Sequence, residues 1–318
     1  MSAPILACSG DGSVVRDSGF GQPSPSSAGA APDPGAAMPG AAPPTGGAST
    51  SAGDPAAGRP GSGSGLDAAP PVTPAAGDGV AGSPEFELAW QDDFDTFDAT
   101  RWQLMTHSWD TNLAQFSAQN VRIENGIAAL DLSAEPSDTL KPFRGVEMRS
   151  IETLTYGKVE ARARLAKGSG VVSSLVLIYT PWPADDWNEL DIEYLGRYAD
   201  RIQFNSMVYL GQPTQPPVTQ SVTPTQYPQL AALGFDASAD FHVYAMEWTP
   251  SGARFSVDGQ VLHLWDAEIT RLKLPMNILL TIWASSAADW AGPIDASSAP
   301  VAAEYDWLKV YRHTGTGP

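Results

Sequence analysis

The chain has 318 residues, a formal net charge of −18 and 42% hydrophobic residues. This length and apolar content suffice for one large domain or two small ones, and the acidic balance argues against nucleic acid and anionic membranes as partners, because both require basic patches. The single cysteine, Cys8, excludes an internal disulfide, and no apolar run approaches the ~20 residues that a membrane-spanning helix needs.

The first 84 residues differ in composition from the rest of the chain. Alanine, proline, glycine and serine dominate, and Phe20 is the only aromatic residue. Such a segment cannot bury enough apolar surface to offset its chain entropy. The sequence therefore predicts a disordered N-terminal segment and linker over residues 1–84, followed by one folded domain over residues 85–318.

A short motif near the N-terminus bears on membrane attachment. Residues 5–10, Ile-Leu-Ala-Cys-Ser-Gly, resemble the end of a bacterial lipoprotein signal, in which the cysteine becomes lipidated. No basic region precedes the motif, and its apolar stretch is shorter than the ~7–15 residues of a signal peptide. A lipid anchor at Cys8 and an unmodified cysteine in a disordered tail are therefore both open.

From Phe86 onward, short apolar runs are separated by turn residues, which is typical of β-strands. Asn125-Gly126 predicts a hairpin, Asp258-Gly259 predicts a turn, and residues 211–233, rich in Gln, Pro and Thr, indicate an enlarged loop. Many short strands without alternating helices predict an all-β sandwich. The expected strands cover residues 88–90, 121–123, 127–130, 156–165, 171–179, 187–196, 202–209, 241–248, 253–257, 261–265, 278–283 and 302–310.

The domain is organised around residues 187–196, Trp-Asn-Glu-Leu-Asp-Ile-Glu-Tyr-Leu-Gly. With the two-residue period of a strand, Glu189, Asp191 and Glu193 share one face. Two like charges ~6 Å apart at an effective dielectric constant of ~20 repel by roughly 2–3 kcal/mol, which is a large part of a typical stability of ~5–15 kcal/mol. The uninterrupted acidic row therefore predicts an active site. The alternative is a half-buried strand with a polar outer face.

Three carboxyl groups in a row suit the hydrolysis of glycosidic bonds. A retaining glycosidase needs a carboxylate nucleophile and a carboxylic acid ~5–5.5 Å apart. Residues i and i+4 of a strand have Cα atoms ~13 Å apart, and two glutamate side chains on a concave sheet can close most of that gap. An aspartate between them would tune the nucleophile and raise the pKa of the acid.

These residues resemble the Glu-x-Asp-x-Glu signature of glycoside hydrolase family 16, most closely its lichenase branch of endo-β-1,3-1,4-glucanases. The resemblance continues in register over about residues 86–312. It includes Ile202-Gln203-Phe204-Asn205, Gly234-Phe235-Asp236, Glu247-Trp248, Val257-Asp258-Gly259, Trp283, Asp289-Trp290-Ala291-Gly292 and Glu304-Tyr305-Asp306-Trp307. It implies a β-jelly roll like that of concanavalin-type lectins, with a concave substrate cleft.

The resemblance also implies catalytic roles. Glu189 matches the nucleophile, Glu193 the general acid/base and Asp191 the helper between them. No cofactor is expected for catalysis. Asp306 matches an aspartate that binds a structural calcium on the convex face, where backbone carbonyls supply other ligands. We expect a secreted or cell-envelope-attached monomer whose partner is a β-glucan polysaccharide.

Five further residues match substrate-binding positions of the family. Trp187 and Trp283 match aromatic platforms for sugar rings. Asn205 matches a polar subsite residue, and Glu147 and Arg149 match a charged pair on a neighbouring strand that contacts sugar hydroxyls. The alternatives are core packing for the tryptophans and a cross-strand salt bridge for the charged pair.

Departures from the lichenase pattern leave the substrate open. Thr281 stands where that branch has an asparagine, Met207 stands where it has a cleft tyrosine, and the loop over residues 211–233 could reshape the cleft. Xyloglucan-active and transglycosylating relatives share the same acidic signature. A third possibility is a non-catalytic carbohydrate-binding sandwich, although such a module has no need of an acid and a nucleophile.

Overall fold

The computed structural model describes residues 85–180, 187–210 and 224–315. The expected disordered segment over residues 1–84 and the lipid anchor at Cys8 lie outside these residues, as does the part of the expected loop over residues 211–223. In the described ranges, no helix is long and apolar enough to cross a membrane.

The described residues form seventeen strands, one four-residue helix and three short 3-10 turns. The strands are β1 (Phe86–Asp92), β2 (Trp102–Leu104), β3 (Ala114–Phe116), β4 (Val121–Glu124), β5 (Ile127–Ala134), β6 (Phe143–Leu154), β7 (Gly157–Arg164), β8 (Val171–Ile178), β9 (Asn188–Leu195), β10 (Arg201–Val208), β11 (Thr225–Gln226), β12 (Gln229–Ala232), β13 (His242–Thr249), β14 (Gly252–Val257), β15 (Gln260–Trp265), β16 (Met276–Ala284) and β17 (Val301–His313). The helix is α1 (Ala288–Ala291), and the 3-10 turns are Ala118–Asn120, Ile269–Arg271 and Ala296–Ser298.

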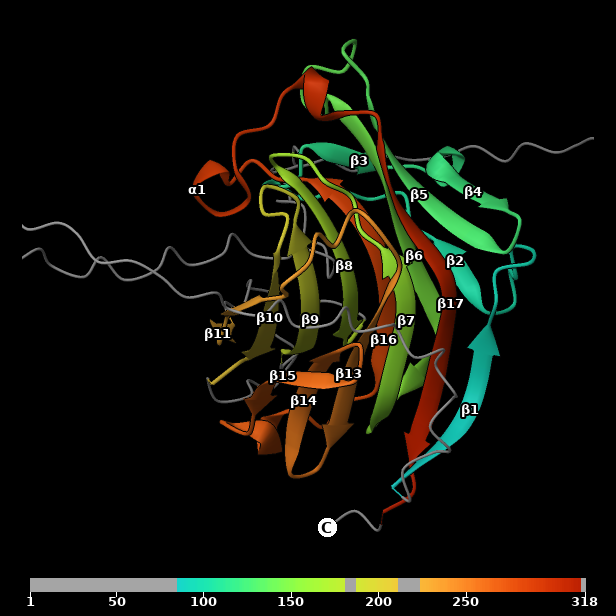
Figure 1. Ribbon diagram of the computed structural model, residues 1–318, viewed down its shortest axis with the longest axis vertical. Helices are drawn as coiled ribbons and strands as arrows, with labels where there is room; N and C mark the ends of the chain where they lie inside the picture. The colour runs from blue at the N-terminus through green and yellow to red at the C-terminus, as the bar shows by residue number, and fades with distance from the viewer. Residues whose placement is uncertain (1–84, 181–186, 211–223, 316–318) are drawn as a thin grey trace, which may run out of the picture. The chain divides into compact units, whose positions relative to one another are not determined.

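The strands pair into two layers (Figure 1). The carboxylate sheet, named for the acidic row on β9, has the order β2-β6-β16-β8-β9-β10, with β11 and β12 beyond β10. The opposite sheet has the order β4-β5-β17-β7-β13-β14-β15, with β1 also paired to β17. All of these pairings are antiparallel, and together they confirm the predicted all-β jelly-roll sandwich.

Two hairpins form where the sequence predicts turns. Asn125 and Gly126, with φ of 54° and 74°, join β4 to β5, and Asp258 and Gly259, with φ of 48° and 76°, join β14 to β15. Positive φ at both central residues is the geometry of a type I′ turn, whose twist matches that of the flanking strands. Asparagine, aspartate and glycine adopt this conformation at low cost.

The prediction of a loop over residues 211–233 is wrong for much of its described part, residues 224–233. Residues 225–226 and 229–232 form β11 and β12, which pair with β10. Without them, β10 would present an edge of unpaired N–H and C=O groups. The Gln-, Pro- and Thr-rich composition gave no signal for these strands, because their formation depends on the neighbouring edge.

The two sheets enclose one hydrophobic core behind β9. Leu190, Ile192 and Tyr194 of β9 belong to it together with Tyr244 and Met246 of β13. Every residue of β9 is buried, whereas β7 buries only alternate residues. A central strand that is covered on both faces is buried throughout, so β9 holds its outward side chains in a shielded environment as well.

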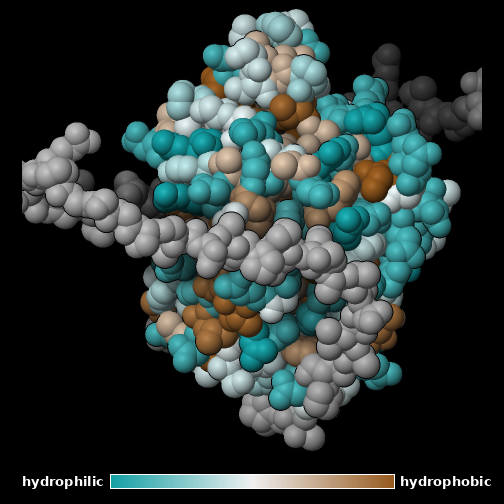
Figure 2. All heavy atoms as spheres, viewed as in Figure 1, coloured by the Kyte–Doolittle hydropathy of each residue, from teal (hydrophilic) through white to brown (hydrophobic). Residues whose placement is uncertain are grey.

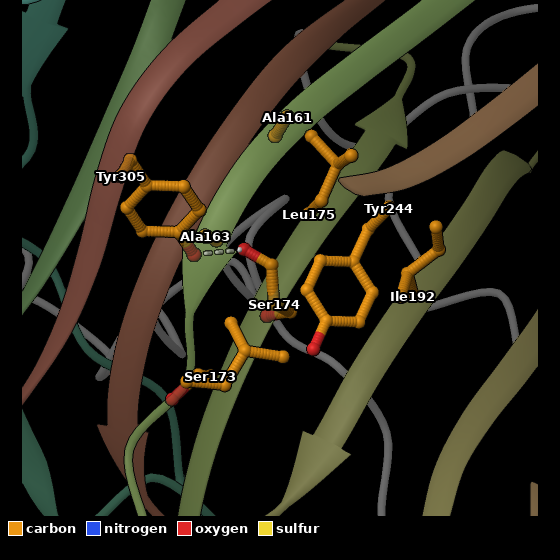
Figure 3. Close-up of a pocket in the computed structure, with 9 residues that line it drawn as sticks. Ala161, Ala163, Ser173, Ser174, Leu175, Ile192, Tyr244 and Tyr305 are labelled. Atoms are coloured by element: carbon orange, nitrogen blue, oxygen red, sulfur yellow. Dashed lines mark hydrogen bonds between the residues drawn. The ribbon is translucent and has the colours of Figure 1, made fainter. Parts of the chain in front are cut away.

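A small cavity lies in this core (Figure 3). Its volume is about 10 Å³, and its lining includes Ser173, Ser174, Ile192, Tyr244 and Tyr305. The Tyr305 hydroxyl donates to the Ser174 carbonyl oxygen at 3.2 Å. This volume holds about one water molecule and no sugar ring, so the cavity is not a substrate pocket.

The face seen in Figure 2 is mostly polar, with a patch of apolar side chains in its lower left part, in the region of β14 and β15. Two side chains of β15, Val261 and Leu264, are 45% and 66% exposed. They belong to the opposite sheet and therefore take no part in the acidic row of β9.

Candidate active site

Glu189, Asp191 and Glu193 project from the outer face of β9. The residues between them face the core, so alternation directs the three carboxyl groups away from it. The three residues are nevertheless only 3%, 1% and 5% exposed. Three buried acidic side chains in one row are costly to keep without a function, because burial disfavours each charge.

Apolar side chains flank the acidic row on the same face. Val176, Ile178 and Leu279 form a small cluster there. In the register of β8 and β9, Val176 lies opposite Asp191 and Ile178 lies opposite Glu189. These neighbours remove water from the carboxyl groups and lower the local dielectric constant, which favours their protonated forms.

Each glutamate has its own hydrogen-bond donor. The indole Nε1–H of Trp187 donates to Glu189 Oε2 at 2.6 Å, and Gln203 Nε2–H donates to Glu193 Oε2 at 2.8 Å. The carboxyl oxygens of Asp191, between the two glutamates on β9, are buried without a hydrogen-bond partner among the described residues. The predicted trio is therefore brought together, and its members differ in their surroundings.

Burial raises the pKa of all three carboxyl groups: that of Glu189 to about 8, that of Glu193 to about 7, and that of Asp191 well above its ordinary value. At Glu189, the hydrogen bond from Trp187 lowers the pKa, while the charge of Glu193 raises it. At Glu193, the hydrogen bond from Gln203 lowers the pKa. At Asp191, the charges of both glutamates add to the effect of burial.

Three interacting carboxyl groups lose their protons in steps that belong to the trio as a whole. Because the pKa of each group is raised, the trio retains protons at a higher pH than three exposed carboxyl groups would. Burial leaves the pKa of Glu189 above that of Glu193, although the hydrogen bond from Trp187 lowers it.

The raised pKa of Asp191 makes stability depend on pH. Between about pH 4, where an unfolded aspartate ionises, and the higher pH at which folded Asp191 ionises, the folded chain binds more protons, so its stability falls as pH rises. We expect Asp191→Asn to remove this penalty and to raise the melting temperature by several degrees at pH 8, roughly 2–4 °C per kcal/mol, and by less at pH 4. Thermal unfolding at both pH values measures this.

Asp200→Asn is the matched control, because the Asp200 side chain is 64% exposed. Its melting temperature should differ from that of the parent by the same small amount at both pH values. If the melting temperature of Asp191→Asn exceeds that of the parent by less at pH 8 than at pH 4, the raised pKa of Asp191 is contradicted.

An aromatic cluster extends the outer face beyond Glu193. Trp283 lies in it and is 3% exposed, with its ring centroid 5.1 Å from that of Trp109 and 5.9 Å from that of Trp290. Trp109 and Trp290 are only partly buried. The two predicted platforms, Trp187 and Trp283, are both buried. The exposed ring surface of the cluster therefore belongs to Trp109 and Trp290.

The other predicted binding residues are held by protein partners. Asn205 Oδ1 accepts from the backbone N–H of Tyr227 at 3.2 Å, which fixes the segment after β11. Arg149 Nε donates to Glu147 Oε1 at 2.8 Å, and His107 Nε2 lies 3.2 Å from Glu147 Oε2. The charged pair is thus a buried ion pair within one strand and not a cross-strand salt bridge.

The position of this pair corrects a prediction. Glu147 and Arg149 lie on β6, which is separated from β9 by β16 and β8 and is not its neighbour. In the register of these four strands, Thr281 of β16 and Ser174 of β8 lie between Glu147 and Glu193. Their hydroxyl groups are hydrogen-bonded to each other. Strand order is a property of the tertiary fold, so spacing along the chain could not indicate it.

Asp306 lies on β17 of the opposite sheet, at a shift in strand register. Its carboxylate forms an ion pair with Arg162 of β7. Within the described part of the chain, no three His, Cys, Asp or Glu side chains group together as metal ligands. Calcium takes 6–8 oxygen ligands, so the side chains alone do not fit a calcium site. Calcium at Asp306 stays a prediction, which melting with and without a chelator checks.

Three residues near the trio had no predicted role. Gln203 and Trp290 stand in the short segments that carry the family resemblance, whereas Trp109 stands in none of them. The sequence did carry a signal for Gln203. This residue stands two positions before Asn205, so the two side chains share one face of β10, and strand alternation could have placed Gln203 near the site. Nothing in the sequence indicates that Trp109 or Trp290 approaches β9.

Comparison with known proteins agrees with the fold. The family model for glycosyl hydrolases family 16 matches residues 107–309. The beta-glucanase of Brevibacillus brevis is 31% identical over 229 residues, which cover 70% of this chain and 81% of that protein. The beta-glucanase of Acetivibrio thermocellus is 32% identical over 223 residues, which cover 69% of this chain and 61% of that protein.

Among solved structures, a prokaryotic β-1,3-1,4-glucanase (lichenase) from a mouse hindgut metagenome superimposes with a TM-score of 0.60 and 29% identity, covering 70% of this chain and 98% of that one. The family match includes the whole of β9 with its acidic row, and most of both sheets. The protein therefore belongs to glycosyl hydrolases family 16 and is a glycoside hydrolase.

Proposed function

We propose that the protein is a retaining endo-β-glucanase that prefers mixed-linkage β-1,3-1,4-glucan and acts by double displacement. The observation that carries this proposal is the buried row in which Glu189 and Glu193 have separate hydrogen-bond donors and Asp191 lies between them. The relatives support the substrate class, because two of them are beta-glucanases and the solved structure is a β-1,3-1,4-glucanase.

The reaction has two steps. Glu193 gives its proton to the glycosidic oxygen while Glu189 attacks the anomeric carbon, which breaks the carbon–oxygen bond and forms a glycosyl ester. Glu189 attacks with Oε1, because Trp187 holds Oε2. Glu193, now ionised, takes a proton from water, and this water displaces Glu189 so that the product retains its configuration.

Sugar rings bind along the outer face of the carboxylate sheet. The half-buried Trp109 and Trp290 offer ring surface to pyranose C–H faces, and the buried Trp283 supports both. The ion pair of Glu147 and Arg149 lies on the same face and can receive hydroxyl groups. None of these steps requires a metal or an organic cofactor.

The test of the substrate is release of reducing sugar from barley β-glucan, lichenan, laminarin, xyloglucan and carboxymethyl cellulose. Activity on the first two alone is the expected result. Activity mainly on laminarin or xyloglucan would shift the specificity and leave the catalytic residues in place. Release from none of the five would contradict a β-glucanase.

A transglycosylating enzyme is the second candidate, because the same residues serve both reactions. Two departures from the lichenase pattern support this second candidate. Met207 lies opposite Glu189 in the β9–β10 pair, and the Thr281 hydroxyl is hydrogen-bonded to that of Ser174. Both change the polar surface that would position water or a second sugar. Mass spectrometry separates the reactions, since products longer than the starting oligosaccharide mean transfer.

The proposal extends to the organisation of the chain. We infer that residues 85–318 are the catalytic domain and that the enzyme works as a monomer, secreted or attached to the cell envelope, where polymeric glucans are found. The family match begins at residue 107, which supports this boundary. We expect removal of residues 1–84 to leave glucanase activity within about 2-fold and the melting temperature unchanged. A large loss of glucanase activity or a large fall in melting temperature would contradict this domain boundary.

A further inference from the structure

The hydrogen bond to Glu193 is part of a longer chain of contacts. Gln203 donates through Nε2 to Glu193 Oε2 at 2.8 Å, and the Gln203 carbonyl oxygen Oε1 accepts from the indole Nε1–H of Trp290 at 3.0 Å. Gln203 lies directly opposite Glu193 in the β9–β10 pair and is 7% exposed. A buried amide is thus held at both ends, by the carboxyl group on one side and by the indole on the other.

Trp290 determines which way the amide points. An indole N–H can only donate, so the atom of Gln203 that faces it must be the carbonyl oxygen. The NH₂ group is then directed at Glu193. If the amide were turned over, its oxygen would face Glu193 and accept the carboxyl proton, which would hold that proton away from a leaving group.

The amide also determines which oxygen of Glu193 is available. Because Gln203 donates to Oε2, the proton of the carboxylic acid is carried by Oε1. We propose that Gln203 and Trp290 are positioning residues that hold Glu193 so that Oε1 delivers the proton to the glycosidic oxygen. This inference rests on the proposed role of Glu193 as the general acid/base.

The helix that carries Trp290 is itself tied to the catalytic strand. Arg197, two residues beyond the end of β9, donates through Nη1 to the carbonyl oxygens of Asp289 at 2.9 Å and Trp290 at 3.2 Å. Gly292 ends α1 with φ of 90°, and a Cβ atom there would lie 2.4 Å from the hydroxyl of Ser169. Contacts at both ends of α1 therefore fix the position of Trp290. A fixed position is needed for its indole to reach Gln203.

The first measurement is the pH dependence of kcat/KM on barley β-glucan for Gln203→Leu. The N–H donor stabilises ionised Glu193, so its removal raises the pKa of this carboxyl group. Because Glu193 acts as an acid only when protonated, the basic limb should move to higher pH by about 1 unit, the size expected for one charge-assisted hydrogen bond. We expect kcat at the optimum to fall roughly 10-fold to 100-fold.

Trp290→Phe keeps a ring at this position and removes the N–H. The amide is then free to turn over, so the basic limb should move in the same direction as in Gln203→Leu. In the double variant, the limb should shift no further than in Gln203→Leu alone, because Trp290 acts on Glu193 only through the amide. A change in KM for Trp290→Phe without any shift of the basic limb would report sugar contact alone and would overturn the positioning role of Trp290.

A second measurement separates positioning from damage to the fold. A 2,4-dinitrophenyl β-glycoside of a glucan oligosaccharide has a leaving group that departs without a proton. Gln203→Leu should therefore lose much less activity in the glycosylation step on this substrate than on barley β-glucan. A merely structural role would lower both activities equally.

The matched controls carry the same chemical changes away from the trio. Gln229→Leu replaces an exposed glutamine on β12, and Trp307→Phe replaces a tryptophan on β17 of the opposite sheet. Both should keep the parent pH profile. Unshifted basic limbs in Gln203→Leu and Trp290→Phe would overturn the positioning role, and so would equal losses on the two substrates.

Failure of this inference can be told apart from failure of the proposed function. Glu193→Ala that retains glucanase activity would overturn the role of Glu193 itself. An inactive Glu193→Ala together with a parent-like pH profile in Gln203→Leu would overturn only the positioning of Glu193 by Gln203 and Trp290.

Discussion

Glu189→Gln is expected to lower the hydrolysis of barley β-glucan by roughly 10⁴-fold or more, because the amide cannot form the glycosyl ester. Glutamine has nearly the same size, and its carbonyl oxygen can still accept the indole N–H of Trp187. Binding of glucan oligosaccharides should therefore stay within a few-fold of the parent. Reducing-sugar release measures the first effect, and titration calorimetry with the inactive variant measures the second.

Glu87→Gln is the control for this variant, since Glu87 is exposed on β1 of the opposite sheet and should be replaceable without loss. In Glu189→Ala, azide should restore cleavage of an activated aryl glycoside and yield an α-glycosyl azide, because azide attacks from the face that Glu189 has vacated. Substantial glucan hydrolysis by Glu189→Gln would remove Glu189 from the reaction.

Glu193→Ala is expected to lower kcat on barley β-glucan by roughly 10²–10⁴-fold, the range typical of a lost general acid. The loss should be far smaller for formation of the glycosyl ester from a 2,4-dinitrophenyl glycoside, which needs no proton. Release of the ester by water then becomes slow, because no base remains to activate the water. A burst of dinitrophenol followed by a slow steady state measures both effects.

Azide distinguishes the two glutamates in this experiment. Azide needs no general base, so it should accelerate turnover of Glu193→Ala and give a β-glycosyl azide by displacing Glu189 from the ester. Glu304→Ala is a control at an acidic residue of β17 that pairs with Arg164 on the opposite sheet. An α-glycosyl azide from Glu193→Ala would mean that the roles of Glu189 and Glu193 have to be exchanged.

Much of the fold follows from local features of the chain. The Asn125-Gly126 and Asp258-Gly259 turns form where predicted, because positive φ at two successive positions is a property of those residues alone. The twelve expected strands also form, with ends that differ by at most four residues. The strands β11 and β12 were not expected, since they depend on the open edge of β10.

The electrostatics of the site were only partly predictable. The sequence indicated that an acidic neighbour would raise the pKa of one glutamate, whereas burial is the largest cause at all three carboxyl groups. The apolar neighbours responsible for that burial, such as Val176 and Leu279, come from β8 and β16. The ion pair of Asp306 with Arg162 likewise joins residues 144 positions apart.

The sequence by itself determined that Glu189, Asp191 and Glu193 share one face of a strand, because the direction of side chains in a strand repeats every two residues. Only the tertiary structure decided what surrounds them. Gln203 reaches Glu193 across the β9–β10 pair, and Trp290 reaches Gln203 from a helix 87 positions further along the chain. Such contacts arise from strand order and packing between distant segments, which no local pattern of residues specifies.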